Sequence, residues 1–330
     1  MASPLLATGK GTPARSALTA AVLVNVSAGT PAGEDEARMA RVQEAFARAD
    51  LAAEVRGVVP ARLPEAVKAA VASDADVVVI GGGDGTLNAA AQVLAGGAKP
   101  MGVLPLGTLN HFARDLGIPS DLDAAVGTIA AGHVREVDVG EANDRIFLNN
   151  CSIGLYPHVV RGREELRHRY GQGKWIAMLQ AAIAVLRRYP VVEVTLRVGD
   201  RSASFRTPFV FVGNNPYAMS LYALGRRERL DGGELGLYFS RDGGRLGLLR
   251  LALFAVLGRL EQDRDFTSRV VPMVEVETGR RLLRVAADGE LTVVSAPLRC
   301  RSRPRALRVL VPRPEPPSAP VPEPVPAPAT

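Results

Sequence analysis

The residues whose types and spacing suggest chemistry lie in one short segment, Ile80–Asn88, which reads IGGGDGTLN. Three consecutive glycines place no Cβ where the chain reverses, so backbone N–H groups can approach a phosphate closely. The stretch that follows, Thr86–Leu94, has a helical pattern, and the positive end of a helix attracts the same anion. The segment predicts a phosphate-binding turn, in which Asp84 and Thr86 add hydrogen-bonding groups.

Two familiar nucleotide motifs do not fit this spacing. A dinucleotide-binding G-x-G-x-x-G fingerprint counted from Gly81 requires glycine at position 86, where Thr86 stands. A P-loop requires G-x-x-x-x-G-K-[ST], and Lys10 has no glycine five positions before Gly9. Neither a dinucleotide dehydrogenase nor a P-loop kinase is expected. A glycine-rich turn without any ligand is the simpler alternative.

A second glycine turn, Leu104–Asn110, follows the next expected strand and reads LPLGTLN. Consecutive parallel strands end at the same edge of a sheet, so we expect Gly107 and Thr108 to line the same pocket as the first turn. Taken alone, Gly-Thr before a helix is most often an N-cap. The pairing of two such turns favours a shared binding role.

Both turns belong to a pattern in which short β-branched runs alternate with helical stretches. The expected strands are Ala20–Val26, Ala53–Val59, Asp76–Ile80 and Met101–Leu104, and the expected helices are Glu34–Ala49, Pro64–Ala72 and Thr86–Leu94. Such alternation is typical of right-handed βαβ units and a parallel sheet covered on both faces. We expect an α/β nucleotide-binding domain over residues 18–140, preceded by a flexible N-terminus, residues 1–17.

After residue 140, strands follow one another without helices long enough to cross over. The expected strands are Ile146–Cys151, Val191–Val198, Ser202–Val212, Glu234–Phe239, Val270–Glu277, Leu282–Ala287 and Leu291–Val294. This succession is typical of an antiparallel β-sandwich. We therefore predict a second, β-rich domain over residues 141–311, whose last strand returns to the first domain.

Two helical stretches and a proline-rich tail interrupt or follow the second domain. The stretch Arg245–Arg264 is apolar around most of its circumference, which indicates either a core helix or a helix that contacts lipid. The other stretch is Lys174–Tyr189. In residues 312–330, nine of nineteen residues are proline, so we expect this tail to be disordered.

The two turns also carry a family resemblance. GGGDGTLN at 81–88, followed by PLGTLNHFARDLGIP at 105–119, resembles the diacylglycerol kinase catalytic domain of bacterial soluble lipid kinases and of sphingosine and ceramide kinases. The resemblance spans roughly Leu18 to Val311. It includes Phe147–Gly154, which resembles the strand that opens the family's second domain, and Asp288-Gly289-Glu290, which matches a late Asp-Gly-Glu.

This resemblance implies a phosphotransferase with an alcohol group as acceptor: a kinase that transfers the γ-phosphate of ATP to diacylglycerol or a related neutral lipid, as in phospholipid biosynthesis. ATP is implied to lie against Asn25, Gly81, Gly82, Gly83, Asp84, Gly85, Thr86, Leu87, Asn88, Gly107 and Thr108. The family's first strand usually ends in Asn-Pro-x-Ser-Gly, whereas Asn25–Gly29 lacks the proline. The closest alternative is an NAD kinase, which shares GGDGT.

Three carboxylates are implied as catalytic groups. Asp84 would act near the phosphates through Mg²⁺, since hard cations take oxygen ligands; alternatively it accepts backbone hydrogen bonds within its own turn. The general base is implied to be Asp288 or Glu290, which the sequence does not separate. By itself, Asp-Gly between two apolar runs predicts only a two-residue hairpin turn.

Asp231 matches a family position that holds a structural Mg²⁺, assisted by backbone oxygens that correspond here to Glu228 and Gly233. A surface turn is the alternative.

The chain has 40 Lys and Arg against 34 Asp and Glu, a formal net charge of +6, and only four of the basic residues are lysine. Arginines cluster at 161–169, 226–229 and 299–308. Each cluster is either a solvated face or one attracted to an anionic membrane. A nucleic-acid-binding module is a weaker alternative, because only 5% of the chain is aromatic and RNA recognition relies on stacking.

Two cysteines, Cys151 and Cys300, are too few for a disulfide framework. There is no uninterrupted run of 18 apolar residues. We expect a cytoplasmic protein, peripheral at the membrane surface, with a membrane-resident neutral lipid as substrate and no nucleic-acid partner. The sequence leaves a homodimer open.

Overall fold

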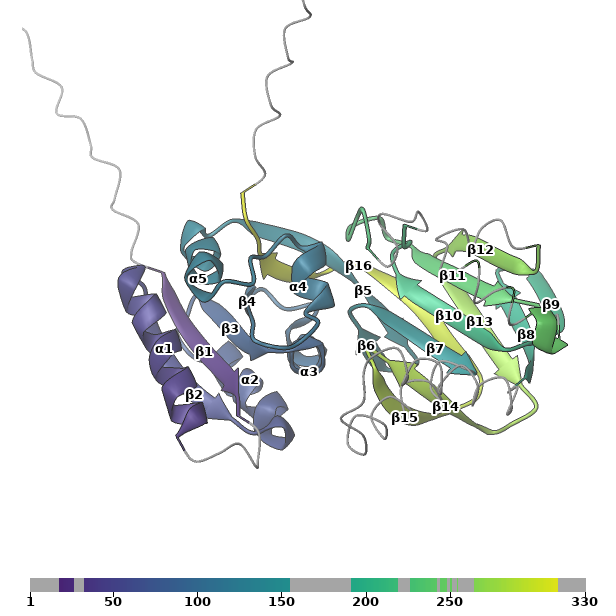
Figure 1. Cartoon of the computed structure of the whole chain (residues 1–330), viewed down its shortest axis with the longest axis horizontal. Coiled ribbons are helices and arrows are strands. Elements are labelled where there is room, and N and C mark those ends of the chain that lie inside the picture. Colours follow the sequence, from purple (N-terminus) through teal and green to yellow (C-terminus); the bar gives the residue numbers. More distant parts are fainter. Residues whose placement is uncertain are drawn as a thin grey trace, which may run out of the picture.

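The structure is a computed structural model of the 330-residue chain. It describes residues 18–26, 33–154, 191–218, 226–241, 244–247, 250, 254 and 264–313. An α/β unit and a β unit lie side by side, and two strands, β5 (Val134–Ala142) and β16 (Leu298–Leu310), run between them (Figure 1).

The first unit is built on parallel strands in the order β2-β1-β3-β4. Their bounds are β1 Thr19–Asn25, β2 Ala52–Val58, β3 Val77–Gly82 and β4 Met101–Pro105. Every residue of β3 and β4 is buried, as expected for central strands with helices on both faces. Strand β16 continues the sheet beside β4, with Val309 opposite Met101.

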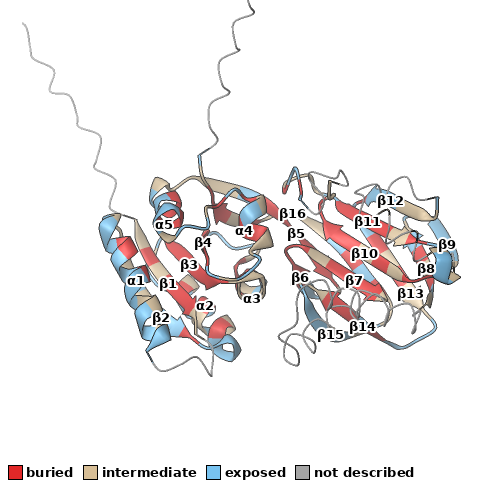
Figure 2. Cartoon of the chain, in the orientation of Figure 1, coloured by how far each residue is buried: buried red, intermediate tan, exposed pale blue. Residues whose placement is uncertain are grey.

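Five helices cover this sheet: α1 Glu34–Arg48, α2 Leu63–Ala72, α3 Asp84–Leu94, α4 His111–Asp115 and α5 Leu122–Ala131. Helix α1 packs against α5, and α2 packs against α3. Val42, Ala45 and Phe46 of α1 are buried at helical spacing, which places an apolar stripe against the core. These elements form the first of two apolar cores (Figure 2).

The second unit consists of two antiparallel layers. One continues the large sheet from β16 through β13 (Met273–Thr278) and β8 (Val192–Val198) to β9 (Arg201–Thr207), while β6 (Arg145–Phe147) pairs with β5. The other has the order β12-β11-β10-β7-β14-β15. Its strands are β12 Phe266–Val271, β11 Leu235–Ser240, β10 Phe209–Asn214, β7 Asn150–Gly154, β14 Leu282–Ala287 and β15 Glu290–Ser295.

The core between these layers contains residues from both sheets, including Cys151 on β7 and Cys300 on β16. Both cysteines are buried and unbridged. The predicted class, an α/β unit followed by an antiparallel β unit, is confirmed.

Three predicted strands are wrong in one respect, because each is divided between the two sheets. The run Ser202–Val212 breaks at Pro208 into β9 and β10, and Val270–Glu277 breaks at Pro272 into β12 and β13. Proline has no N–H to donate to a ladder, so it ends the pairing and lets the chain change sheets. Similarly, Ile146–Cys151 is divided between β6 and β7.

Within the described ranges, no helix is long and apolar enough to span a membrane. Of the apolar stretch predicted over residues 245–264, the structure describes only 245–247, 250, 254 and 264. The predicted helix 174–189, the arginine cluster 161–169 and the segments 1–17 and 314–330 lie outside the described residues.

Candidate active site between the two units

The two glycine turns lie against each other at the carboxyl edge of the parallel sheet. A Cβ on Gly107 would stand 2.4 Å from Cα of Gly83, so no side chain fits at that position. The N–H of Leu106 also donates to the carbonyl oxygen of Gly82 at 3.1 Å. The absence of Cβ atoms therefore brings the two backbone segments into contact.

Asn110 holds the second turn in shape. Its side chain accepts a hydrogen bond from Gly107 N–H (3.0 Å) and donates to the carbonyl oxygens of Pro105 (3.0 Å) and Gly107 (2.8 Å). The residue itself has φ +48°, a conformation that asparagine tolerates better than most residues. With the turn held in this way, Leu106 (36%) and Leu109 (48%) remain exposed beside the glycines.

Asn25 and Thr86 meet at the first turn. The Asn25 side chain, at the end of β1, donates to Thr86 Oγ1 at 2.9 Å. Gly82 leaves the room for this contact, since its Cβ would stand 2.6 Å from Thr86 Oγ1. Asn25 Oδ1 is buried, and the described part of the chain supplies no hydrogen-bond partner for it. An unpartnered buried acceptor beside a glycine turn suits a ligand that donates a hydrogen bond.

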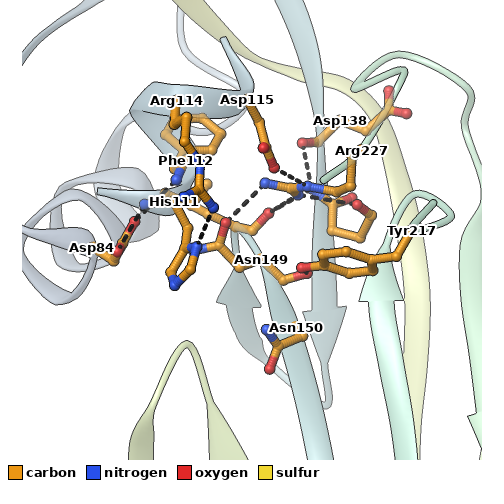
Figure 3. A network of polar contacts seen from close by, with 12 residues as sticks. Asp84, His111, Phe112, Arg114, Asp115, Asp138, Asn149, Asn150, Tyr217 and Arg227 are labelled. Atoms are coloured by element: carbon orange, nitrogen blue, oxygen red, sulfur yellow. Dashed lines mark hydrogen bonds and ion pairs between the residues drawn. The ribbon is translucent and has the colours of Figure 1, made fainter. Parts of the chain in front are cut away.

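Asp84 connects the first turn to the second. Its Oδ2 accepts from His111 N–H at 3.1 Å and its Oδ1 from Phe112 N–H at 3.0 Å, at the start of α4 (Figure 3). These bonds reach across to another segment, whereas the sequence alternative placed them within its own turn. A carboxylate has about four lone-pair sites, so Asp84 retains acceptor capacity beyond these two bonds.

The Asp288-Gly289 pair forms the hairpin turn between β14 and β15. Both residues have positive φ, +47° and +85°, as two-residue hairpin turns of this kind require. The Asp288 carboxylate accepts N–H groups of Leu148 (2.7 Å), Asn149 (2.8 Å) and Asn150 (3.0 Å). It also accepts from the side chain of Asn88 on α3.

These contacts limit what Asp288 can do. Burial raises the pKa of the Asp288 carboxyl above its ordinary value, and the backbone and Asn88 hydrogen bonds oppose that rise. Four donors already occupy the carboxylate. Asp288 therefore positions the loop at residues 148–150 and the hairpin, and its geometry is not that of a free base.

Glu290 lies beside the first glycine turn. The residue is exposed, and its Oε1 lies 2.9 Å from the point where a Cβ on Gly85 would stand. Gly85 belongs to the first turn of α3, whose N-terminus has no side-chain cap. The structure thus separates the two carboxylates: Asp288 holds the hairpin, and Glu290 faces the first glycine turn.

Helix α3 is fastened to the second unit near this point. Asn88 and Gln92 donate to the carbonyl oxygen of Ile146 on β6 at 3.0 and 2.7 Å, and the Ile146 N–H donates back to Gln92 Oε1 at 3.0 Å. Since Gly85 and Asn88 are three residues apart, they lie on the same face of the helix. The hairpin residues Asp288 and Glu290 both meet that face.

A buried arginine that sequence reasoning assigned to the surface completes the site. Arg227 donates from Nε to Asp115 Oδ2 at 2.8 Å, and both side chains are almost fully buried, at 0% and 2% exposure. Its Nη1 donates to the Leu148 carbonyl oxygen (2.6 Å) and its Nη2 to Asn149 Oδ1 (2.8 Å) (Figure 3). Of the cluster 226–229, Arg227 is therefore internal, while Arg226 and Arg229 are exposed.

These contacts close a polar ring around the junction of the two units. The ring runs from Asp84 through α4 to Asp115, then to Arg227 and the loop 148–150, and returns through Asp288 and Asn88 to α3. We name this set the interdomain ring. Nothing local in the sequence marks Asp115 or Arg227 as partners, since 112 positions separate them.

Tyr217 lies under the arginine of this ring. The Arg227 guanidinium carbon is 5.6 Å from the Tyr217 ring centre, a distance compatible with a cation–π contact. The Tyr217 hydroxyl donates to the Asn149 carbonyl oxygen at 3.1 Å. Burial raises the pKa of Tyr217 to about 12.

The position expected to hold a structural metal has arginine partners. Asp231 accepts from Arg135 Nη2 at 3.1 Å and from Arg229 Nε at 3.3 Å. Glu228 is exposed, and the N–H of Gly233 donates to Asp138 Oδ2 at 2.6 Å. Among the described residues, no group of three or more His, Cys, Asp or Glu side chains converges.

The arginine cluster 299–308 also finds carboxylate partners within the chain. Arg299 pairs with Glu275 at 2.6 Å, and Arg301 and Arg303 pair with Glu141 at 2.5 and 3.3 Å. Much of this cluster's charge is therefore balanced internally.

Comparisons with known proteins find similarity in the region that contains the two glycine turns. Residues 19–142 match the family model of the diacylglycerol kinase catalytic domain. This match covers less than half of the chain, so it shows similarity to that catalytic domain over the first unit and strand β5.

Two relatives illustrate the extent of the similarity. The diacylglycerol kinase of Mycobacterium tuberculosis (strain H37Rv) is 29% identical over 252 residues, which cover 74% of this chain and 80% of the relative. The diacylglycerol kinase of Staphylococcus epidermidis (strain RP62A) is 42% identical over 95 residues, which cover 27% of this chain and 29% of the relative. The aligned region thus spans less than a third of the Staphylococcus protein.

Solved structures show the same fold over both units. A crystal structure of a Bacillus anthracis (strain Sterne) protein named as a diacylglycerol kinase has a TM-score of 0.68 at 23% identity, covering 89% of this chain and 97% of that chain. A second one has a TM-score of 0.63 at 18% identity, covering 89% and 96%.

Proposed function

We propose that the protein is an ATP-dependent lipid kinase that transfers the γ-phosphate to a hydroxyl of diacylglycerol or a related neutral lipid. The observation that carries this proposal is the approach of Glu290, from the second unit, to Gly85 at the start of α3 in the first. A phosphate-binding turn and a carboxylate base thereby face each other. Relatives named as diacylglycerol kinases support a lipid acceptor.

The first unit supplies the groups for the nucleotide. The uncapped N-terminus of α3 presents backbone N–H groups and a positive dipole end to phosphate. Thr86 and Thr108 add hydroxyl donors, and the unpartnered Oδ1 of Asn25 suits a hydroxyl donor of the nucleotide. Mg²⁺ bound with ATP would neutralise phosphate charge, and Asp84 has acceptor capacity to hold it.

Glu290 supplies the proton acceptor. A primary hydroxyl is a very weak acid, so the base must act in concert with transfer. As the lipid oxygen forms its bond to the γ-phosphorus, Glu290 takes the hydroxyl proton, the bond to the β-phosphate oxygen breaks and ADP leaves. Asp288 keeps Glu290 in place through the hairpin turn.

The same hairpin offers a surface for a membrane-resident substrate. Leu282 (64%), Leu291 (44%) and Val293 (59%) are exposed on β14 and β15, and Arg281 and Arg284 are exposed among them. Apolar side chains with basic neighbours suit peripheral contact with an anionic bilayer. Contact there would bring Glu290 towards the lipid hydroxyl.

The test is transfer of labelled γ-phosphate from Mg-ATP to a panel of neutral lipids in mixed micelles, with NAD offered in parallel. Label on a lipid is expected; label on NAD alone would replace the proposal with an NAD kinase. Glu290→Gln should lower kcat by about 10² to 10⁴. Glu44→Gln, which alters an exposed glutamate on α1, is the matched control and should leave the rate unchanged.

A further inference from the structure

The contacts of Asp231 identify what balances its charge. Asp231 lies in the loop before β11, and each carboxylate oxygen has its own guanidinium partner: Oδ2 meets Arg135 at 3.1 Å and Oδ1 meets Arg229 at 3.3 Å. Arg135 belongs to β5, the strand that runs between the two units. The pair therefore joins the loop to β5.

The surroundings do not fit a divalent cation. Mg²⁺ takes near-octahedral oxygen ligands at about 2.0 to 2.1 Å, and Ca²⁺ takes six to eight oxygens. Among the described residues, no three His, Cys, Asp or Glu side chains converge here. A cation would therefore have backbone oxygens and the Asp231 carboxylate, whose two oxygens already meet guanidinium groups. The two guanidinium groups, both within 4 Å of the carboxylate, would also repel a divalent metal ion.

The ionisation of the Asp231 carboxyl agrees with its pairing to two arginines. Burial acts to raise the pKa of Asp231, but the hydrogen bonds and charges of Arg135 and then Arg229 outweigh it, so the pKa lies below its ordinary value. The carboxyl is therefore ionised at neutral pH, and two cationic side chains already compensate its charge.

We propose that the guanidinium of Arg135, assisted by Arg229, takes the place of a structural metal ion at Asp231, so that this chain needs no divalent cation there. Arg135 is the principal partner, because its side chain is 37% exposed whereas that of Arg229 is 70% exposed.

A second carboxylate on β5 supports the same loop. Asp138 Oδ2 accepts the Gly233 N–H at 2.6 Å, and its Oδ1 accepts the Arg305 N–H of β16 at 2.8 Å. The loop is thus attached to β5 at Asp231 and again at Gly233, in both cases by groups of the protein itself.

The first experiment uses the full chain without nucleotide, so its outcome does not depend on catalysis. Purified protein is passed over a desalting column, its metal content is measured, and its Tm is compared with and without EDTA. We expect no stoichiometric Mg²⁺ or Ca²⁺ and an unchanged Tm. Retained metal that disappears in Asp231→Asn, together with a lower Tm in EDTA, would overturn the proposal.

The second experiment removes the arginines. The double variant Arg135→Gln, Arg229→Gln should have a Tm lower by about 2 to 4 °C, and Mg²⁺ should restore part of that loss only while Asp231 is present. An unchanged Tm would overturn the proposal. Arg56→Gln, at an exposed pair with Glu54, is the matched control.

Discussion

Replacing Gly85 by alanine should separate catalysis from stability. The new Cβ would stand 2.9 Å from Glu290 Oε1, whereas ordinary van der Waals contact begins at 3.4 Å. The carboxylate must therefore move by about 0.5 Å, the tolerance within which catalytic groups have to be held. Gly85 lies in α3 without a positive φ, so alanine is compatible with its backbone and raises helix propensity by up to about 1 kcal/mol.

We expect Gly85→Ala to retain or raise the Tm while kcat falls about tenfold to a hundredfold, since a 1 Å misplacement can cost about 10²-fold. The measurements are thermal unfolding of the full chain and initial rates of label transfer to diacylglycerol in mixed micelles. Because the new Cβ meets Glu290, the effect should appear in kcat. The KM for ATP is measured in the same assay, since Gly85 also belongs to the turn proposed to hold the phosphates, and a loss mainly in kcat indicates a displaced base.

Two controls make the result interpretable. In a Glu290→Gln background, Gly85→Ala should add little further loss, because both changes act on one interaction. Gly107→Ala should behave differently: its Cβ would stand 2.4 Å from the Gly83 backbone, so both Tm and rate should fall. A Gly85→Ala enzyme with the original kcat, or with a full additional loss in Glu290→Gln, would refute the placement of Glu290 as the base.

Three further predictions concern the interdomain ring. Arg227→Ala leaves Asp115 buried without its cation and should lower the free energy of unfolding by about 3 to 5 kcal/mol, measured by urea denaturation. Asp288→Asn places amide hydrogens against the N–H groups of residues 148–150 and should cost about 1 to 3 kcal/mol while also lowering kcat, although Glu290 is intact. The pKa of Tyr217 is about 12 in the folded chain and near 10 when unfolded. The contribution of Tyr217 to the free energy of unfolding should therefore be present below about pH 10 and decline towards pH 12. Tyr217→Phe should remove that part of the alkaline decline in the urea midpoint.

The features that the sequence predicted well are those with local causes. Strand and helix alternation in the first unit follows from apolar periodicity, and the strands expected there lie within two residues of β1 to β4. The contact between the two glycine turns follows from the absence of Cβ atoms, which is visible in the sequence. The breaks at Pro208 and Pro272 were not predicted, although their local cause, the missing proline N–H, is visible in the sequence.

The features that could not be predicted depend on contacts between distant positions. Arg227 resembles its exposed neighbours in sequence, and only the fold buries it against Asp115. Asp288 and Glu290 are chemically similar and two residues apart, yet the loop at Leu148, 140 positions away, occupies the first and not the second. Charge, burial and hydrogen-bond supply at these sites are tertiary properties, so periodicity and motif spacing carry no information about them.

The hairpin that bears these two carboxylates explains why they take different roles. Asp288 meets α3 at Asn88, and Glu290 meets the same helix one turn earlier, at Gly85. The positive φ values of Asp288 and Gly289 set the direction in which β15 leaves the turn, so anchoring the first carboxylate determines where the second one lies. Asn88 and Gly85 share one helix face beside the first glycine turn, so in the proposed mechanism the position of the base is tied to that of the phosphates. The rate should therefore depend on Asp288 through geometry and on Glu290 through proton transfer.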